Sequence, residues 1–85
     1  MLGKNFPVSD YYRDHIVDAL TISRAGKWWS AVLVIEHPTN KKRFICLYRW
    51  EKKDGVWKTR KNFKINSMKD ADKLVEIINT LKEKM

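Results

Sequence analysis

The chain has 85 residues and a formal net charge of +8, with 18 Lys and Arg against 10 Asp and Glu. This length allows one domain, here 1–85, with one small core, and the single cysteine, Cys46, excludes an internal disulfide. Because there is no secretory signal and no apolar run near the ~18 residues that cross a bilayer, we expect an intracellular protein, in the cytoplasm or nucleoid of a prokaryote or archaeon.

The N-terminal part of the chain has no dominant pattern. Residues 1–9 contain glycine, proline and polar residues, and we expect a flexible arm there. After Ser9 the apolar spacing fits a short helix, whereas Ile16 and Leu20 also fit the period of a strand. We favour a strand over 16–24 with a helical turn before it.

A tight turn and a clear strand follow. Gly26 in the Ala25-Gly26-Lys27 step can supply the positive φ that a hairpin turn requires. Residues 28–36 include a mostly β-branched run, which predicts a strand, and Pro38 lies just beyond its end.

The next two strands are predicted to form a second hairpin. We expect strands over 42–51 and 56–65, both rich in aromatic and apolar residues at their ends or centre. The Asp54-Gly55 pair between these runs is a strong hairpin signal.

The C-terminal part changes to a helical period. Ser67 followed by Asp70 is typical of a capping box, so we expect a helix over 68–84. The predicted fold is therefore α+β, a curved four-stranded antiparallel sheet followed by one long amphipathic helix. The apolar stripe of this helix is wider than one sheet requires, which indicates contact with a second subunit. The residues assigned to this dimer interface are Val75, Ile78 and Leu81.

The positive charge is concentrated in the second hairpin. Residues 41–64 hold ten Lys and Arg against Glu51 and Asp54, a surplus equal to the net charge of +8. Most of the aromatic residues lie in or next to this region. Cations for phosphates and flat rings for unpaired bases are what single-stranded nucleic acid requires, although aromatic residues also simply favour sheets.

Strand alternation divides these residues between two faces. The cations assigned to the ligand face are Arg43, Arg49, Lys58, Arg60 and Lys64. Strict alternation places Lys61 and Phe63 on the core side with Trp57, Thr59 and Ile65. Trp29 belongs to the more apolar face of its strand, which leaves Trp28 as the expected stacking platform.

The second half of the chain resembles the positive cofactor four family of transcriptional coactivators and its Whirly-like relatives. The resemblance lies in the segment Phe44-Ile45-Cys46-Leu47-Tyr48-Arg49-Trp50, in Asp54-Gly55, in Lys58-Thr59-Arg60-Lys61 and in the final helix. It implies a homodimer with helices packed between subunits, and a sheet that binds single-stranded or melted DNA. The contacts that it implies are Arg49, Lys58, Arg60 and Lys61. A contact at Lys61 would require a bulge in its strand or a position at the end of the strand.

Other functional classes lack their usual signals. There is no glycine-rich phosphate loop, nucleophile elbow or paired-carboxylate arrangement, so we expect no enzyme activity and no cofactor. His15, His37 and Cys46 lack metal-ligand spacing, so no metal is expected. The expected function is single-stranded DNA binding with low sequence specificity. The alternatives are an RNA-binding or duplex-binding chromosomal protein and an interaction module for an acidic partner.

Overall fold

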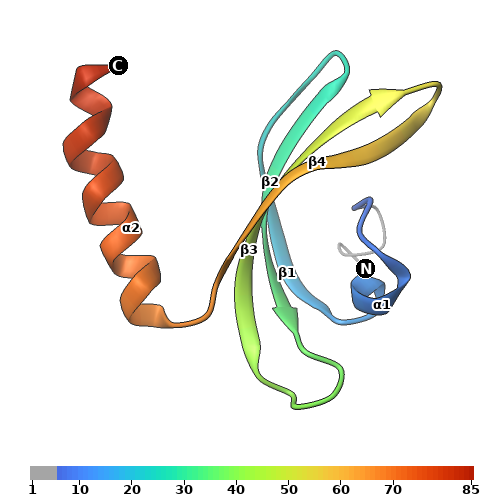
Figure 1. Cartoon of the computed structure of the whole chain (residues 1–85), viewed down its shortest axis with the longest axis horizontal. Coiled ribbons are helices and arrows are strands. Elements are labelled where there is room, and N and C mark those ends of the chain that lie inside the picture. The colour runs from blue at the N-terminus through green and yellow to red at the C-terminus, as the bar shows by residue number, and fades with distance from the viewer. Residues whose placement is uncertain (1–5) are drawn as a thin grey trace.

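A computed structural model describes residues 6–85, which form a four-stranded antiparallel sheet in the order β1-β2-β3-β4 followed by a helix (Figure 1). The elements are α1 (Asp10–Arg13), β1 (Ile16–Ala25), β2 (Trp28–Glu36), β3 (Arg43–Lys53), β4 (Val56–Ile65), α2 (Met68–Leu81) and a final 3-10 turn, η2 (Lys82–Lys84). This arrangement confirms the predicted α+β class and the order of four strands and a helix. The segment after Ser9 contains both expected elements, a one-turn helix and then a strand.

Two hairpin turns use positive φ angles, as the sequence predicts. Gly26 has φ +58°, and Asp54 and Gly55 have φ +54° and +79°. Positive φ at both central residues defines a type I′ turn, whose twist matches that of the strands beside it. The Asp54-Gly55 step therefore sets the register between β3 and β4.

The core lies on one face of the sheet, which we call the core face. Side chains alternate along β2 and β3, so that one set from each strand is buried. This set consists of Trp29, Ala31, Leu33, Ile35, Phe44, Cys46 and Trp50. The burial of Trp29 agrees with the face assigned to it from the sequence.

The segment before α1 covers this core. Phe6 and Val8 are buried, and the Phe6 ring lies 5.1 Å from the Trp29 ring, centroid to centroid. Full burial of a large apolar side chain stabilises a fold by about 1.5 to 3 kcal/mol. Phe6 and Val8 are therefore packed against the core and do not belong to a free arm, and the first five positions of the expected arm over 1–9 lie outside the described residues.

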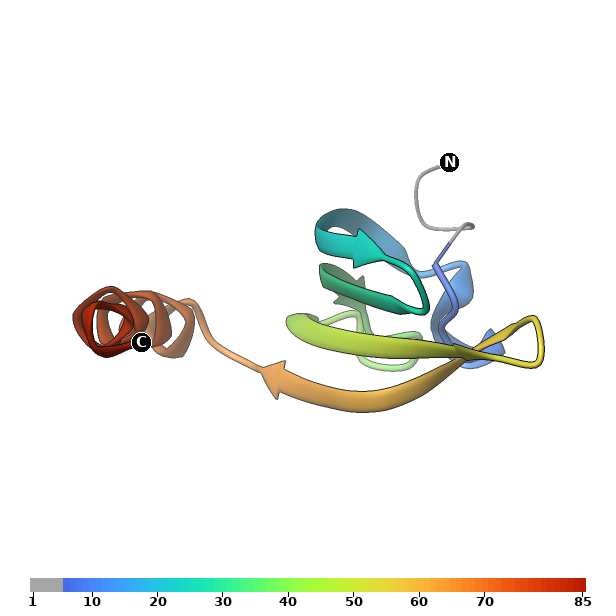
Figure 2. The same ribbon diagram turned by 90° about the horizontal axis from the view of Figure 1, so that it is seen from above.

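Helix α2 begins as predicted but does not lie on the sheet. The Ser67 Oγ accepts a hydrogen bond from the backbone N–H of Asp70 at 3.1 Å, which confirms the cap. None of the residues of α2 is buried, and the helix extends away from the sheet on the side opposite α1 (Figures 1 and 2). The helix ends at Leu81, and the remaining residues of the predicted span 68–84 form the 3-10 turn η2 instead.

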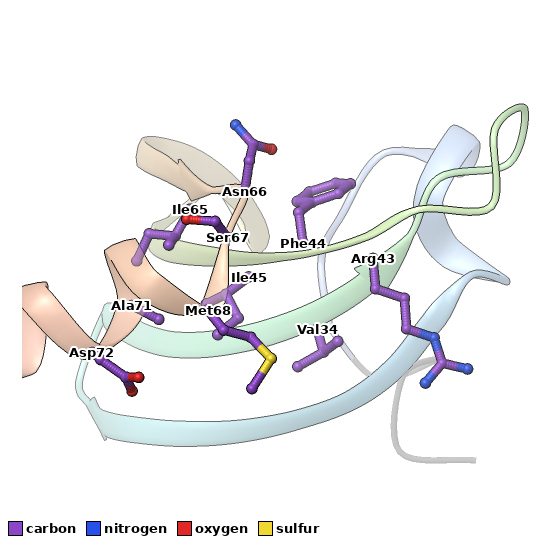
Figure 3. A pocket seen from close by; sticks show the side chains of 10 residues that line it. All are labelled: Val34, Arg43, Phe44, Ile45, Ile65, Asn66, Ser67, Met68, Ala71 and Asp72. Atoms are coloured by element: carbon purple, nitrogen blue, oxygen red, sulfur yellow. The ribbon is translucent and has the colours of Figure 1, made fainter.

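The other face of the sheet, which we call the open face, has no covering element within residues 6–85. Leu47 and Phe63 are cross-strand partners on this face, and Phe63 is 61% exposed. Near the first turn of α2, Val34, Ile45 and Met68 border a cavity of about 400 Å³ (Figure 3). The open face is therefore apolar at the end of the sheet nearest to α2.

Candidate nucleic-acid interface

The strand register brings four of the predicted site residues together on the open face. Trp28 pairs with Glu51, which pairs with Lys58, while Arg49 pairs with Lys61. Cross-strand partners point to the same side of a sheet, so these side chains are neighbours. They lie at the end of the sheet that carries the hairpin turns. We call Arg49, Lys58, Arg60 and Lys61 the basic patch.

A β-bulge in β4 explains how Arg60 and Lys61 both belong to this patch. Thr59 pairs with Trp50 and Lys61 pairs with Arg49, which leaves Arg60 as the extra residue. The bulge shifts the alternation by one position for the rest of β4. The face of Lys61 is thus the one that the family resemblance implies, and not the core side that strict alternation predicts.

The same bulge makes two other face assignments wrong. Phe63 was expected on the core side but lies on the open face opposite Leu47. Lys64 was expected on the ligand face but pairs with Cys46 on the core face. Its ammonium lies 4.9 Å from the centre of the Phe44 ring and 3.4 Å from the Tyr12 hydroxyl.

Arg43 is the second predicted contact that lies apart from the patch. It shares the open face but sits at the opposite end of β3, where its partner in β2 is Glu36. The Arg43 Nε lies 3.4 Å from a carboxylate oxygen of Glu36. The seven predicted contact residues therefore divide into a group of five around the hairpin turns and two separate positions.

Glu51 is an acidic residue beside the basic patch, and its carboxylate contacts two cations. Its carboxylate accepts a 2.8 Å hydrogen bond from the Arg60 Nε, and its second oxygen lies 3.5 Å from the Lys27 ammonium. These contacts, first of all the bond from Arg60, lower the pKa of Glu51 below its ordinary value. Glu51 thus stays charged, and it holds Arg60 across the surface. Sequence reasoning missed Lys27, because no local pattern links the first hairpin to Glu51.

Trp28 combines an exposed ring with a neighbouring cation. Trp28 is 36% exposed. The Arg49 guanidinium lies 4.5 Å from the centre of the Trp28 ring, within the range of a cation–π interaction. Such stacking holds the guanidinium beside the ring instead of leaving it free to rotate.

The residues assigned to a dimer interface are solvent-exposed in the single chain. Val75, Ile78 and Leu81 on α2 are 57%, 49% and 54% exposed. The structure therefore leaves their apolar surface available, and it brings none of them to the basic patch.

Within residues 6–85 no group of three or more His, Cys, Asp or Glu is placed to hold a metal ion. Cys46 is buried, and burial raises the pKa of its thiol, which keeps it protonated and unreactive. No helix in the described chain is both long and apolar enough to cross a bilayer.

Comparison with known proteins finds no match for this chain among family models, curated proteins or solved structures.

Proposed function

We propose that this chain is a non-enzymatic protein that binds single-stranded DNA with low sequence specificity, and that it acts as a homodimer. The observation that carries the proposal is the basic patch beside Trp28 on the open face. The likeness of the second hairpin and α2 to the positive cofactor four family points in the same direction.

The patch has the chemistry that a polyanion requires. Four cations lie on two adjacent strands, and Lys27 adds a fifth from the neighbouring turn. Their carboxylate neighbour, Glu51, is half-buried on the same surface and offsets one of these charges. The remaining surplus attracts phosphates through release of condensed counterions, which does not depend on base sequence.

The aromatic ring beside the patch favours single strands over duplexes. A duplex buries its base faces, and its major groove admits a helix or a narrow two-stranded ribbon. An unpaired strand instead exposes bases that can stack on an aromatic ring such as Trp28, with each stacked base contributing about 1 to 3 kcal/mol. DNA is favoured over RNA as the partner because the positive cofactor four family, which the second half of the chain resembles, binds single-stranded or melted DNA.

The dimer is supported by the exposed surface of the chain. The chain exposes 6632 Å², whereas a compact monomer of 10.2 kDa exposes roughly 5300 Å². The difference is about 1300 Å² of exposed surface per copy. If a dimer interface buried this area on both copies, it would bury about 2600 Å² in total, which lies within the roughly 2000 to 5000 Å² buried in obligate homodimers.

The second copy has a defined apolar surface to cover. Most of the exposed large apolar side chains lie on α2 or on the sheet, including Leu20, Phe63, Val75 and Ile78. Pairing α2 of one copy with the open face of the other would cover groups of both kinds, whereas pairing α2 with α2 would cover those on the helix. The basic patch lies at the hairpin-turn end of the open face, so it remains accessible when the second copy covers the end of this face nearest to α2.

Binding titrations at several salt concentrations test this proposal. Labelled single-stranded DNA, duplex DNA and RNA of equal length are titrated and followed by fluorescence anisotropy. If about four to six phosphates are neutralised, log affinity for the single strand should fall with log salt at a slope near −3 to −4. Tighter binding to duplex or RNA would replace the proposed partner, and no binding to any nucleic acid at low salt would leave the acidic-protein alternative.

Light scattering tests the dimer separately. We expect a mass of twice 10.2 kDa at micromolar concentration. A monomer mass under these conditions would contradict the assembly without affecting the proposed binding surface.

A further inference from the structure

A polar depression lies on the core face, beside the segment that covers the core. Its volume is about 410 Å³, within the roughly 300 to 1,000 Å³ of small-ligand sites. Two cross-strand pairs of β3 and β4, Tyr48 with Asn62 and Cys46 with Lys64, form much of its floor. We call this depression the Tyr48 groove. Its lining residues are Ser9, Tyr12, Cys46, Tyr48, Thr59, Asn62 and Lys64.

The groove combines an aromatic ring with hydrogen-bonding groups. The Tyr48 ring stacks on the buried Trp50 ring, with centroids 5.1 Å apart and an angle of 6° between the planes. Burial raises the pKa of Tyr48 to about 12, so the phenol stays protonated and can donate a hydrogen bond. Asn62 adds an amide that both donates and accepts.

The charge of the groove also limits what it can bind. Lys64 supplies one ammonium group, and none of the lining residues is acidic. The Lys64 ammonium is within 3.4 Å of the Tyr12 hydroxyl, so that it is held at one side of the groove. A flat polar ring with an attached anion, which describes a nucleotide, matches this combination of groups.

We propose that the Tyr48 groove binds one unpaired nucleotide, with the base beside Tyr48 and Asn62 and the phosphate at Lys64. This inference rests on the proposed function for the source of the nucleotide, which is the strand bound by the basic patch. It adds a base preference to a surface that otherwise binds without regard to sequence. Because a carboxamide pairs with both the N6 and the N7 of adenine, adenine is the expected base.

The position of β4 makes one continuous path possible. β4 is an edge strand of the sheet, so a nucleic acid can pass around it (Figure 2). Residues of the basic patch, Lys58, Arg60 and Lys61, point to the open face, whereas Asn62 and Lys64 point to the groove. A strand that follows the patch toward Asn62 therefore meets the groove when it crosses this edge.

Nuclear magnetic resonance of the full chain with single nucleotides tests the groove directly. The four deoxynucleoside monophosphates are titrated separately, and the signals of the Asn62 amide group and the Tyr48 ring are followed. We expect dAMP to give the largest shifts and the tightest binding. Replacement of Asn62 with alanine should weaken dAMP binding about 30-fold, as expected for loss of the two hydrogen bonds of a bidentate pair.

The matched control is Asn66→Ala, the same substitution at an exposed asparagine outside the groove. It should leave dAMP binding unchanged. Absence of shifts at Asn62 and Tyr48 with all four nucleotides would overturn the inference, as would equal weakening by the two asparagine variants.

A second variant separates failure of the groove from failure of the proposed function. The double variant Arg49→Ala/Arg60→Ala should lose affinity for an oligonucleotide and retain dAMP binding. If the wild-type protein binds dAMP in the groove but binds no oligonucleotide, the groove stands and the proposed function fails. If it binds oligonucleotides without shifts in the groove, the inference fails and the proposed function stands.

Discussion

Replacing Arg49 and Arg60 together with alanine tests whether the basic patch binds phosphates. Both side chains lie on the surface, where Arg49 stacks over Trp28 and Arg60 pairs with Glu51. If each cation neutralises one phosphate of a single strand, the salt slope should become shallower by about 1.4. Extrapolated over the tenfold range from 1 M to 0.1 M salt, this corresponds to about 25-fold weaker binding at 0.1 M.

The same variant should change stability only slightly. A surface ion pair contributes about 0 to 1 kcal/mol, and an exposed cation–π contact about 0.5 to 1 kcal/mol. Together these contacts contribute at most about 2 kcal/mol, so we expect Tm to fall by no more than roughly 8 to 16 °C for a domain of this size. A much larger loss would show that these arginines support the fold and that the binding surface has been placed on the wrong face.

A matched variant controls for net charge. Lys41→Ala/Lys42→Ala also removes two positive charges, but from the β2–β3 loop at the opposite end of the sheet. Fluorescence anisotropy with the same labelled strand should show at most about a threefold loss of affinity, because long-range attraction is largely screened at 0.1 M salt. Equal losses in the two double variants would refute a localised patch and indicate that only total charge matters.

Four further substitutions test separate parts of the account. Phe6→Ala should lower Tm by at least about 12 °C in calorimetry, because loss of a buried phenylalanine costs about 3 to 5 kcal/mol, whereas the exposed Tyr11→Ala should change it little. Glu51→Gln should strengthen single-strand binding because it frees Lys27 and Arg60 from the carboxylate. Protonation has the same effect in the wild-type protein, so its binding should strengthen only when the pH falls below the lowered pKa of Glu51. Trp28→Ala should weaken binding about 5- to 150-fold if a base stacks there, and an unchanged Kd would remove the stacking role. Ile78→Asp should give a monomer in light scattering, and a persistent dimer would exclude α2 from the interface.

Local signals in the sequence were sufficient to predict most of the fold. Asp54-Gly55 can adopt the positive φ angles of its turn, and the Ser67 side chain caps the next helix directly. These signals depend on residues close together in the chain. The strands and the start of the helix could therefore be predicted without knowing the tertiary structure.

The candidate site could be predicted only in part, because one bulge changes the face of several side chains. Nothing local marks Arg60 as an extra residue, since its neighbours alternate as in a regular strand. The bulge brings Lys61 to the patch and sends Lys64 to the core face. A sequence reading that assumes an unbroken period of two cannot detect this change.

The segment that covers the core also could not be predicted from local sequence patterns. Phe6 and Val8 lie in a short segment without periodicity, and only their contact with the aromatic residues of the core face makes them structural. Conversely, the amphipathic stripe of α2 predicted a packed helix, but none of its residues is buried in the single chain. Amphipathicity predicts that a face will be covered without identifying the element or subunit that covers it.

Mapping the binding surface by NMR gives the most direct test of the central claim. An unlabelled single-stranded DNA is titrated into isotopically labelled protein, and the backbone amide shifts are followed along the chain. The account predicts that the largest shifts cluster at Trp28, Arg49 and residues 58–61, and that they diminish as salt is raised. The absence of shifts, or shifts confined to the β2–β3 loop, would contradict it.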